Sequence, residues 1–374
     1  MRVAIDATPL LLRSAGVKNH LYHWIVHLRR LAGEGAVVTF PLRAPLGELS
    51  HERSVWGSAA TLAGLARLHL TNYSPLPLAD WLGPKADVFH ASQQLWNPPR
   101  RTPVTATLYD MTCWLMPEMH TPANVAAARR FAERVVKRAA GLLAISESTR
   151  ADAIRLLGLP PERIDVVYPG VADGFFAVTG DAVRAARQKY ALARPYVLFV
   201  GTVEPRKNLP VLLDAFARLA PATREQHELV VAGPLGWADR ATAARLRAAA
   251  GGVRYLGYVP EPDLPGITAG AAVLAYPSLY EGFGFPVAQA MAAGVAVLTS
   301  NVSSLPEVAG DAALLVDPRS VEEIRAALER LLGSPDLRAR LGAAGVRRAQ
   351  SFRWEACARA SLRFFEKVAG KEIR

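Results

Sequence analysis

Short runs rich in Val, Ile and Leu recur along the first half of the chain, and longer helical patterns separate several of them. The short runs do not alternate with polar residues, which is typical of strands in a parallel sheet that is covered on both faces. Helical patterns such as His20–Leu31 and Asn124–Ala140 lie between them. The predicted strands are Val3–Asp6, Val37–Phe40, Val88–Ala91, Val104–Leu108, Leu142–Ile145 and Ile164–Val167.

The second half repeats this arrangement, although the two halves share no clear sequence repeat. Its predicted strands are Tyr196–Val200, Leu229–Ala232, Val253–Leu256, Val273–Tyr276, Val295–Thr299 and Leu314–Val316. Its predicted helices include Leu209–Leu219, Arg240–Ala250 and Val321–Leu332. A doubly wound α/β pattern that occurs twice predicts two Rossmann-like domains that face each other across a cleft.

The break between the domains is predicted near Pro169 to Thr179, a segment with two glycines and few helix formers. We expect an N-terminal domain over residues 1–172 and a C-terminal domain over residues 173–354. A final helix in residues 355–374, whose pattern begins about Trp354, is expected to return to the first domain. The length of 374 residues fits two domains.

The composition indicates the cellular compartment in which the protein is expected. The chain contains no run of about 18 apolar residues that would predict a membrane span. The segment Met1–Asp6 fits a first strand better than a signal peptide. Cys113 and Cys357 are far apart, so they give neither a zinc-binding spacing nor a disulfide framework. These features together predict a cytoplasmic protein.

The net charge of +11 is spread over the chain, and no nucleic-acid-binding signature accompanies it, so we expect no nucleic acid partner. The densest basic patch lies on a predicted helix. One interpretation is a solvated helix face. The other is a surface that contacts the inner face of the membrane or a phospholipid-linked acceptor. The patch consists of Arg129, Arg130, Arg134, Lys137 and Arg138.

Candidate chemistry follows two strands of the second half. Arg206 and Lys207 come shortly after the strand that ends at Gly201. Ligands bind beyond the carboxyl ends of parallel strands, so this pair is placed to bind a diphosphate, although an ordinary basic loop would have the same sequence.

The strand that ends at Tyr276 leads into the most specific segment. It contains Glu281, a suitable acceptor of hydrogen bonds from sugar hydroxyls, and then Gly282, Phe283, Gly284 and Phe285 before a helix start at Pro286. Glycines let backbone N–H groups approach a ligand, and a helix N-terminus favours negative charge. The alternative is a tight structural turn in which Glu281 caps the helix.

These segments resemble the retaining glycosyltransferases of family 4, which have the GT-B fold. They resemble in particular the mannosyltransferase-like members of that family. The resemblance covers nearly the whole chain. It rests on five segments that match family motifs: Gly201–Asn208, Glu281–Pro286, Ala144–Thr149, Val167–Val171 and Ser303–Gly310.

The resemblance implies roles for individual residues. Arg206 and Lys207, in the loop that starts at Gly201, would bind the donor diphosphate, and Glu281 would bind the donor sugar. The donor site would also include the backbone around Gly282, Phe283, Gly284 and Phe285. The backbone near Tyr258 and Val259 would face the base, with Leu264 packed close by. Gly16, in the segment Ser14–His20, would belong to a glycine loop that meets the donor phosphates and the acceptor.

Two positions depart from the family pattern. Members commonly carry His followed by Asp or Glu after the fourth strand, where this chain has Tyr109 and Asp110, which we expect to be catalytic residues. The second Glu of the E-x7-E motif, which meets the ribose in the family, is Gln289. Both substitutes still form hydrogen bonds, but each removes a group that can carry charge. Tyr109 as a packing residue and Gln289 as a helix-surface amide are the simpler interpretations.

The implied reaction moves a hexosyl group, for example mannosyl, from a nucleotide-diphosphate sugar to a glycan or lipid-linked acceptor in cell-surface polysaccharide assembly. The chain has no Asp-x-Asp pair, so we expect no metal or other cofactor besides the donor substrate. By the resemblance, the N-terminal domain would bind the acceptor and the C-terminal domain the nucleotide-sugar donor. Loops Ser92–Trp96 and Cys113–His120 of the N-terminal domain are candidates for the acceptor side. The alternatives are a catalytically weak or inactive nucleotide-sugar-binding homologue and a sugar-nucleotide epimerase; the motifs around Arg206 and Glu281 argue against the epimerase.

Overall fold

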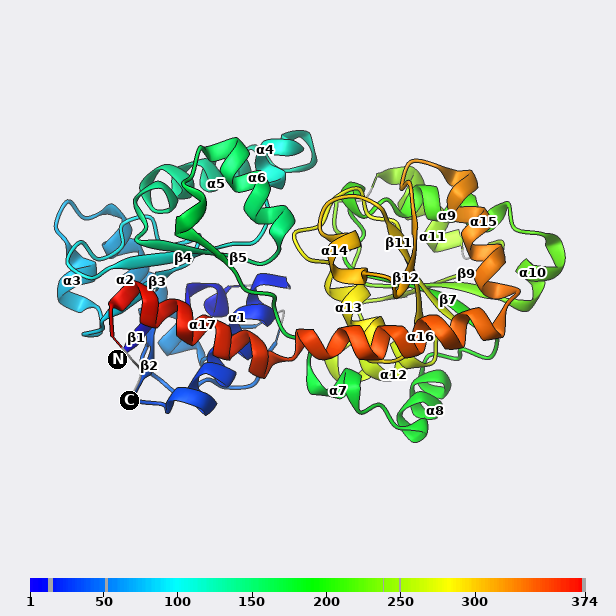
Figure 1. Ribbon diagram of the computed structural model, residues 1–374, viewed down its shortest axis with the longest axis horizontal. Coiled ribbons are helices and arrows are strands. Elements are labelled where there is room, and N and C mark those ends of the chain that lie inside the picture. The colour runs from blue at the N-terminus through cyan, green and yellow to red at the C-terminus, as the bar shows by residue number, and fades with distance from the viewer. Residues whose placement is uncertain (13–15, 51–52, 238, 249, 372–374) are drawn as a thin grey trace. The chain divides into compact units, whose positions relative to one another are not determined.

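A computed structural model describes residues 1–12, 16–50, 53–237, 239–248 and 250–371. The chain divides into two compact units. Unit 1 consists of Met1–Gly170 together with Trp354–Arg374, and unit 2 consists of Val171–Arg353. Each unit contains one parallel sheet with helices on both faces (Figure 1). The predicted fold class, two Rossmann-like α/β domains, is confirmed.

The sheet of unit 1 has the strand order β2-β1-β3-β4-β5-β6, and every neighbouring pair is parallel. Because β2 and β3 lie on opposite sides of β1, the winding direction reverses between β1 and β3. The carboxyl ends of those two strands therefore form the edge where ligands bind in this architecture. The strands are β1 (Val3–Asp6), β2 (Val37–Phe40), β3 (Val88–Ala91), β4 (Val104–Leu108), β5 (Gly141–Ala144) and β6 (Ile164–Val166).

Two hydrophobic clusters cover the faces of this sheet. Val3 and Ile5 of β1 belong to one cluster with α1 and α17, whereas Ala4 belongs to the other with α5 and α6, as the two-residue period of a strand requires. The helices of unit 1 are α1 (Gly16–Ala32), α2 (Ser58–Tyr73), α3 (Leu78–Leu82), α4 (Thr112–Leu115), α5 (Pro122–Arg134), α6 (Glu147–Leu157) and α17 (Trp354–Ala369).

The predicted helix Asn124–Ala140 is wrong at its carboxyl end. Helix α5 ends at Arg134, and a 3₁₀ turn, Val136–Arg138, follows it. Val135 and Val136 are both buried in the second cluster, and β5 starts at Gly141. Burying two β-branched side chains there while turning the chain into β5 accounts for the end of the α-helix.

Gly170 and Trp354 pack against each other where the chain leaves unit 1 and returns to it. A Cβ atom on Gly170 would lie 2.3 Å from ring atoms of Trp354, so only glycine fits beside this indole. Helix α17 then packs along α1, and Trp24 Nε1 donates a hydrogen bond of 2.8 Å to Ser361 Oγ. The last segment of the chain is thus part of the core of unit 1.

The sheet of unit 2 has the order β12-β11-β10-β7-β8-β9, again with every neighbouring pair parallel. The winding direction reverses between β7 and β10, so the ligand-binding edge is predicted at their carboxyl ends. The strands are β7 (Tyr196–Val200), β8 (Glu228–Ala232), β9 (Val253–Gly257), β10 (Val273–Tyr276), β11 (Ala296–Ser300) and β12 (Ala313–Val316).

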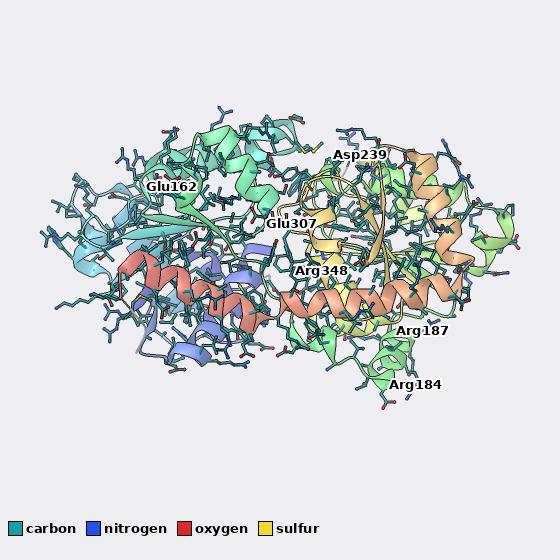
Figure 2. All side chains as sticks on the ribbon, viewed as in Figure 1. Glu162, Arg184, Arg187, Asp239, Glu307 and Arg348 are labelled. Carbon is teal, nitrogen blue, oxygen red and sulfur yellow. The ribbon has the colours of Figure 1, made fainter. Side chains whose placement is uncertain are left out.

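Helices α9 and α15 pack together on one face of this sheet, and α12, α13 and α16 lie on the other (Figure 1). Arg348 of α16, labelled with Glu307 in Figure 2, donates hydrogen bonds to the carbonyl oxygens of Glu307 (2.6 Å) and Val308 (3.2 Å). The helices are α7 (Asp173–Phe176), α8 (Gly180–Lys189), α9 (Leu209–Ala217), α10 (Pro221–Gln226), α11 (Arg240–Ala248), α12 (Leu264–Ala269), α13 (Phe285–Ala292), α14 (Leu305–Ala309), α15 (Val321–Leu332) and α16 (Pro335–Ala349).

Candidate active site

The carboxylate of Glu281 is the centre of a charged cluster at the β7–β10 edge of unit 2. Its Oε1 atom lies 2.8 Å from Lys207 Nζ, and its Oε2 atom lies 2.9 Å from Arg206 Nη1. The hydroxyls of Tyr276 and Ser278 each donate a hydrogen bond of 2.8 Å to Oε1. The structure therefore brings together the three residues that the sequence placed after two different strands.

Electrostatic attraction decides the ionisation of Glu281. Burial raises the pKa of its carboxyl group, but the charges of Arg206 and Lys207 outweigh this effect and lower the pKa to about 2. Burial also lowers the pKa of Lys207, which Glu281 partly counteracts. Glu281 is thus an ionised acceptor of hydrogen bonds at neutral pH.

A second carboxylate balances the charge of the cluster. Glu204 Oε1 accepts a hydrogen bond of 2.6 Å from Arg206 Nη2, and Arg206 Nη1 donates one of 2.6 Å to the carbonyl oxygen of Tyr280. Two cations, Arg206 and Lys207, therefore face two anions, Glu204 and Glu281. A bound diphosphate would have to compete with these carboxylates for the two cations.

Hydrogen bonds between loops hold this cluster in place. Asn208 Nδ2 donates to the carbonyl oxygens of Pro277 (3.0 Å) and Pro318 (2.6 Å), which joins the loops after β7, β10 and β12. Ser303 Oγ accepts from the N–H of Glu281 at 3.0 Å, and Ser304 Oγ donates to its carbonyl oxygen at 2.9 Å. The segment that begins at Ser303 resembled the family pattern, and here it positions the backbone of Glu281.

The residues after Glu281 lead into α13. Phe283 is buried, with its ring 5.3 Å from that of Phe285 and 5.2 Å from that of Phe352. Gly284 precedes α13 with φ of +98°, a left-handed conformation that favours glycine. Gln289 lies about one turn into α13 and is half-buried.

The residues predicted around the base follow the edge strand β9. Tyr258 is 45% exposed, Val259 is buried, and Leu264 is the first residue of α12. In the strand order, β8 separates β9 from β7. These residues share the carboxyl edge of the sheet with Lys207 but lie beyond the next strand.

In unit 1, Tyr109 and Asp110 follow β4 directly. Tyr109 Oη lies 3.1 Å from Nδ1 of the buried His20. Asp110 Oδ1 accepts hydrogen bonds from the N–H (3.0 Å) and the hydroxyl (2.6 Å) of Thr112, and His120 Nε2 lies 2.8 Å from that hydroxyl. Tyr109, which departs from the family pattern, and Asp110, which fits it, are thus both held by neighbouring side chains.

Gly16 is the first residue of α1 and exposed. Its neighbours Ser14 and Ala15 lie outside the residues that the structure describes. The predicted acceptor loop Ser92–Trp96 starts beside Asp6, whose buried carboxylate accepts a hydrogen bond of 3.2 Å from the N–H of Ser92. Within unit 1, this loop therefore begins at the ligand-binding edge of the sheet.

Among the described residues, no group of three or more His, Cys, Asp or Glu side chains could hold a metal ion. None of the helices in the described part of the chain is long and apolar enough to cross a membrane.

Comparison with known proteins gives consistent results for both halves. The family described as "Glycosyltransferase Family 4" matches residues 14–175, and "Glycosyl transferases group 1" matches residues 183–348. "O-antigen chain mannosyltransferase B" of Escherichia coli is 35% identical over 274 residues, 72% of this chain and 72% of that protein. "Serotype-specific mannosyltransferase WbdA" of Escherichia coli is 27% identical over 62% of this chain, which spans only 29% of that longer protein.

Among solved structures, Anabaena HepE in complex with UDP and glucose has a TM-score of 0.72 and 18% identity. The alignment covers 98% of this chain and 99% of HepE. At this level of identity the similarity concerns the fold.

Proposed function

The chain belongs to the retaining glycosyltransferases of family 4, and we propose that it transfers a mannosyl group from a nucleoside-diphosphate sugar to a growing surface polysaccharide. The observation that carries this proposal is the ionised Glu281 between Arg206 and Lys207 at the β7–β10 edge. The mannosyl group and the polysaccharide are proposed because the Escherichia coli relative is an O-antigen chain mannosyltransferase.

The proposed mechanism exchanges ion pairs within this cluster. The donor diphosphate takes over contacts of Arg206 and Lys207, which frees Glu281 to accept hydrogen bonds from hydroxyls of the sugar. As the bond between the sugar and the diphosphate breaks, the two cations stabilise the charge that develops on the leaving group. In the retaining reaction, the leaving phosphate itself takes the proton of the acceptor hydroxyl, so no enzymic nucleophile is required.

A panel of nucleotide sugars tests this function. The protein is incubated with GDP-mannose and with UDP-, ADP- and dTDP-sugars, with and without a mannose-terminated oligosaccharide, and release of the nucleotide is measured. UDP-sugars belong in the panel because the HepE structure contains UDP and glucose. We expect acceptor-stimulated turnover of GDP-mannose. Nucleotide binding without turnover of any donor would instead support the non-catalytic homologue.

We further propose that the acceptor is lipid-linked and that unit 1 contacts the inner face of the membrane from the cytoplasm. Six exposed large hydrophobic side chains lie on or between α2 and α3, which we call the α2–α3 patch. Its exposed fractions range from 38% for Leu82 to 68% for Leu62. Exposed Trp, Tyr and Leu side chains next to cations are typical of proteins that bind membrane surfaces. The patch consists of Leu62, Leu70, Tyr73, Leu76, Trp81 and Leu82.

The α2–α3 patch continues into the basic face of α5. The ring of Tyr73 contacts that of Trp96 at 5.6 Å, and the guanidinium of Arg130 lies 4.8 Å from the centre of the Trp96 ring. Arg130 and the other four cations of the basic patch are exposed, although Lys137 forms an ion pair of 2.6 Å with Glu133. Apolar and cationic surface therefore meet at Trp96.

Sedimentation with vesicles tests this contact. We expect binding to vesicles that contain phosphatidylglycerol, and at least tenfold weaker binding for the Leu70→Ser, Trp81→Ser variant. Trp237→Ser, which changes a 54% exposed Trp of unit 2, is the matched control and should bind like the wild type. Equal binding of all three proteins would contradict the role of the α2–α3 patch.

A further inference from the structure

His20 is a buried imidazole whose ring nitrogen meets the hydroxyl of a residue in the candidate site. It lies on α1, is 4% exposed, and places Nδ1 3.1 Å from Tyr109 Oη. Its ring stands edge-on to that of Tyr109 at 5.3 Å and packs against Trp24 (5.9 Å) and Trp354 (5.5 Å). Three aromatic neighbours therefore fix the orientation of the imidazole.

The contact joins α1, which starts at Gly16 of the expected glycine loop, with the strand end at which Tyr109 departs from the family pattern. Tyr109 directly follows β4, at the carboxyl edge of the sheet, and is half-buried. His20 lies four residues after Gly16, about one turn into α1. The hydrogen bond thus connects the first turn of α1 with the end of β4.

Another buried histidine shows what a purely structural imidazole looks like in this unit. His90 of β3 has Nδ1 2.9 Å from Thr105 Oγ1 and Nε2 2.9 Å from Thr107 Oγ1. Both of its ring nitrogens are used by neighbours on β4 inside the sheet. His20 differs because its Nδ1 contacts Tyr109, which lies at the carboxyl edge of the sheet after β4, the strand next to β3.

We propose that His20 is a positioning residue that holds the Tyr109 hydroxyl in the orientation needed to hydrogen-bond the sugar substrates. This inference rests on the proposed transferase function. If Nδ1 carries the proton, it donates to Tyr109, and the phenolic O–H remains available to donate to a substrate oxygen. If Nδ1 is unprotonated, it accepts from Tyr109, and the phenolic oxygen remains available to accept from a substrate hydroxyl.

The imidazole acts as a neutral group. Burial, together with the smaller effect of the nearby His23, lowers the pKa of His20 to about 3. Trp24, Trp354 and Tyr109 are the other aromatic side chains in contact with it. The contact therefore keeps its form throughout the pH range in which the enzyme would be assayed.

A double-mutant cycle separates positioning from a structural role. His20→Phe keeps an aromatic ring but removes the hydrogen bond, and Tyr109→Phe removes the hydroxyl. We expect each single variant to lower kcat about tenfold, with the donor KM within twofold of the wild type. Because His20 acts through the Tyr109 hydroxyl, the double variant should be no more than twofold slower than Tyr109→Phe.

Two isosteric variants sharpen the test. The amide of His20→Asn occupies the place of Nδ1, whereas that of His20→Gln lies nearer the place of Nε2. We expect Asn to restore most of the lost kcat and Gln to restore little. Thermal melting of every variant, with His90→Asn as the comparison for a structural histidine, shows which of them fold.

The possible results are distinct. If the wild type turns over a nucleotide sugar but the losses of His20→Phe and Tyr109→Phe multiply, the positioning role is wrong and the transferase function stands. Equal activity of His20→Asn and His20→Gln would also overturn it. If the wild type turns over no donor in the panel, the proposed function fails, and this inference fails with it.

Discussion

Lys207→Met tests whether the cluster around Glu281 is a diphosphate site. Methionine has a similar length and no charge, so the change removes one cation and leaves Arg206 2.9 Å from the carboxylate. Replacing both cations would leave Glu281, which is 8% exposed, with only the hydroxyls of Tyr276 and Ser278. The single variant is therefore the better probe, because Arg206 still pairs with the buried carboxylate of Glu281.

The structure gives a magnitude for the effect on stability. A pKa of about 2 for Glu281, against 4.5 for the ordinary group, corresponds to about 3 kcal/mol in favour of the ionised form. Lys207 supplies part of this stabilisation, but its own burial is unfavourable. We therefore expect Lys207→Met to lower the free energy of unfolding by about 2 kcal/mol.

The pH dependence has a definite sign. Because folding lowers the pKa of Glu281, its stabilisation is present above about pH 4.5 and is lost as the pH falls towards 2. Removal of Lys207 raises this pKa, so the loss of stability attributable to Glu281 should begin at a higher pH in Lys207→Met. Urea unfolding at several pH values measures this difference.

Nucleotide binding provides the decisive contrast. Loss of one charge-assisted contact should weaken binding of the nucleoside diphosphate by about 1.5 to 3 kcal/mol, or roughly 10- to 100-fold. Glu281→Gln removes the group that competes for the cations, so it should bind the nucleotide at least as tightly as the wild type while turnover falls. Calorimetry compares the variants, and Asp214→Asn, in an exposed ion pair with Arg245, is the control. The reasoning is refuted if Lys207→Met binds the nucleotide as the wild type does, or if Glu281→Gln loses as much affinity as Lys207→Met.

Three other results are expected. Turnover should survive EDTA, because the sequence lacks an Asp-x-Asp pair; activity that disappears with the chelator and returns with Mg²⁺ or Mn²⁺ would contradict this. Gln289→Glu should lower the donor KM about tenfold at unchanged kcat, because a carboxylate accepts hydrogen bonds from ribose hydroxyls more strongly than an amide, by about 1 to 2 kcal/mol. Steady-state kinetics measures both constants, and an inactive wild type that becomes active on this substitution would contradict the prediction. Gly170→Ala should lower the free energy of unfolding by at least about 2 kcal/mol through its clash with Trp354, whereas Gly57→Ala, with no atom within 4 Å of the new Cβ, should be nearly neutral in the same unfolding assay.

The sequence predicted the strands better than the helices. Parallel strands are buried on both faces, so runs such as Tyr196–Val200 have a strong signal, and the errors are limited to strand ends such as Gly141. Helix α2 was not predicted because its apolar residues do not form one stripe. Leu62 and Leu70 are among the most exposed hydrophobic side chains of the described residues. A pattern that does not separate a buried face from an exposed one gives no periodic signal.

The candidate site was predictable only where it follows directly from strand ends. Arg206, Lys207 and Glu281 come soon after the two strands that flank the reversal of winding, so the topology alone brings them to one edge. The contacts of Ser303 with Glu281 and of His20 with Tyr109 span 22 and 89 residues. Neither has a local sequence signal, because each depends on how distant elements pack.

The place of Trp354–Arg374 in unit 1 has a consequence for synthesis on the ribosome. All of Val171–Arg353 is translated before α17, the helix that completes the packing on one face of the sheet of unit 1. Unit 2 can therefore fold before unit 1 is complete. Until α17 emerges, the surface of α1 that carries Trp24 lacks Phe365, whose ring lies 5.9 Å away in the finished protein. A nascent chain that stalls before Trp354 would therefore present an apolar surface to chaperones and proteases, and a premature stop in the last helix would damage the first unit rather than the second.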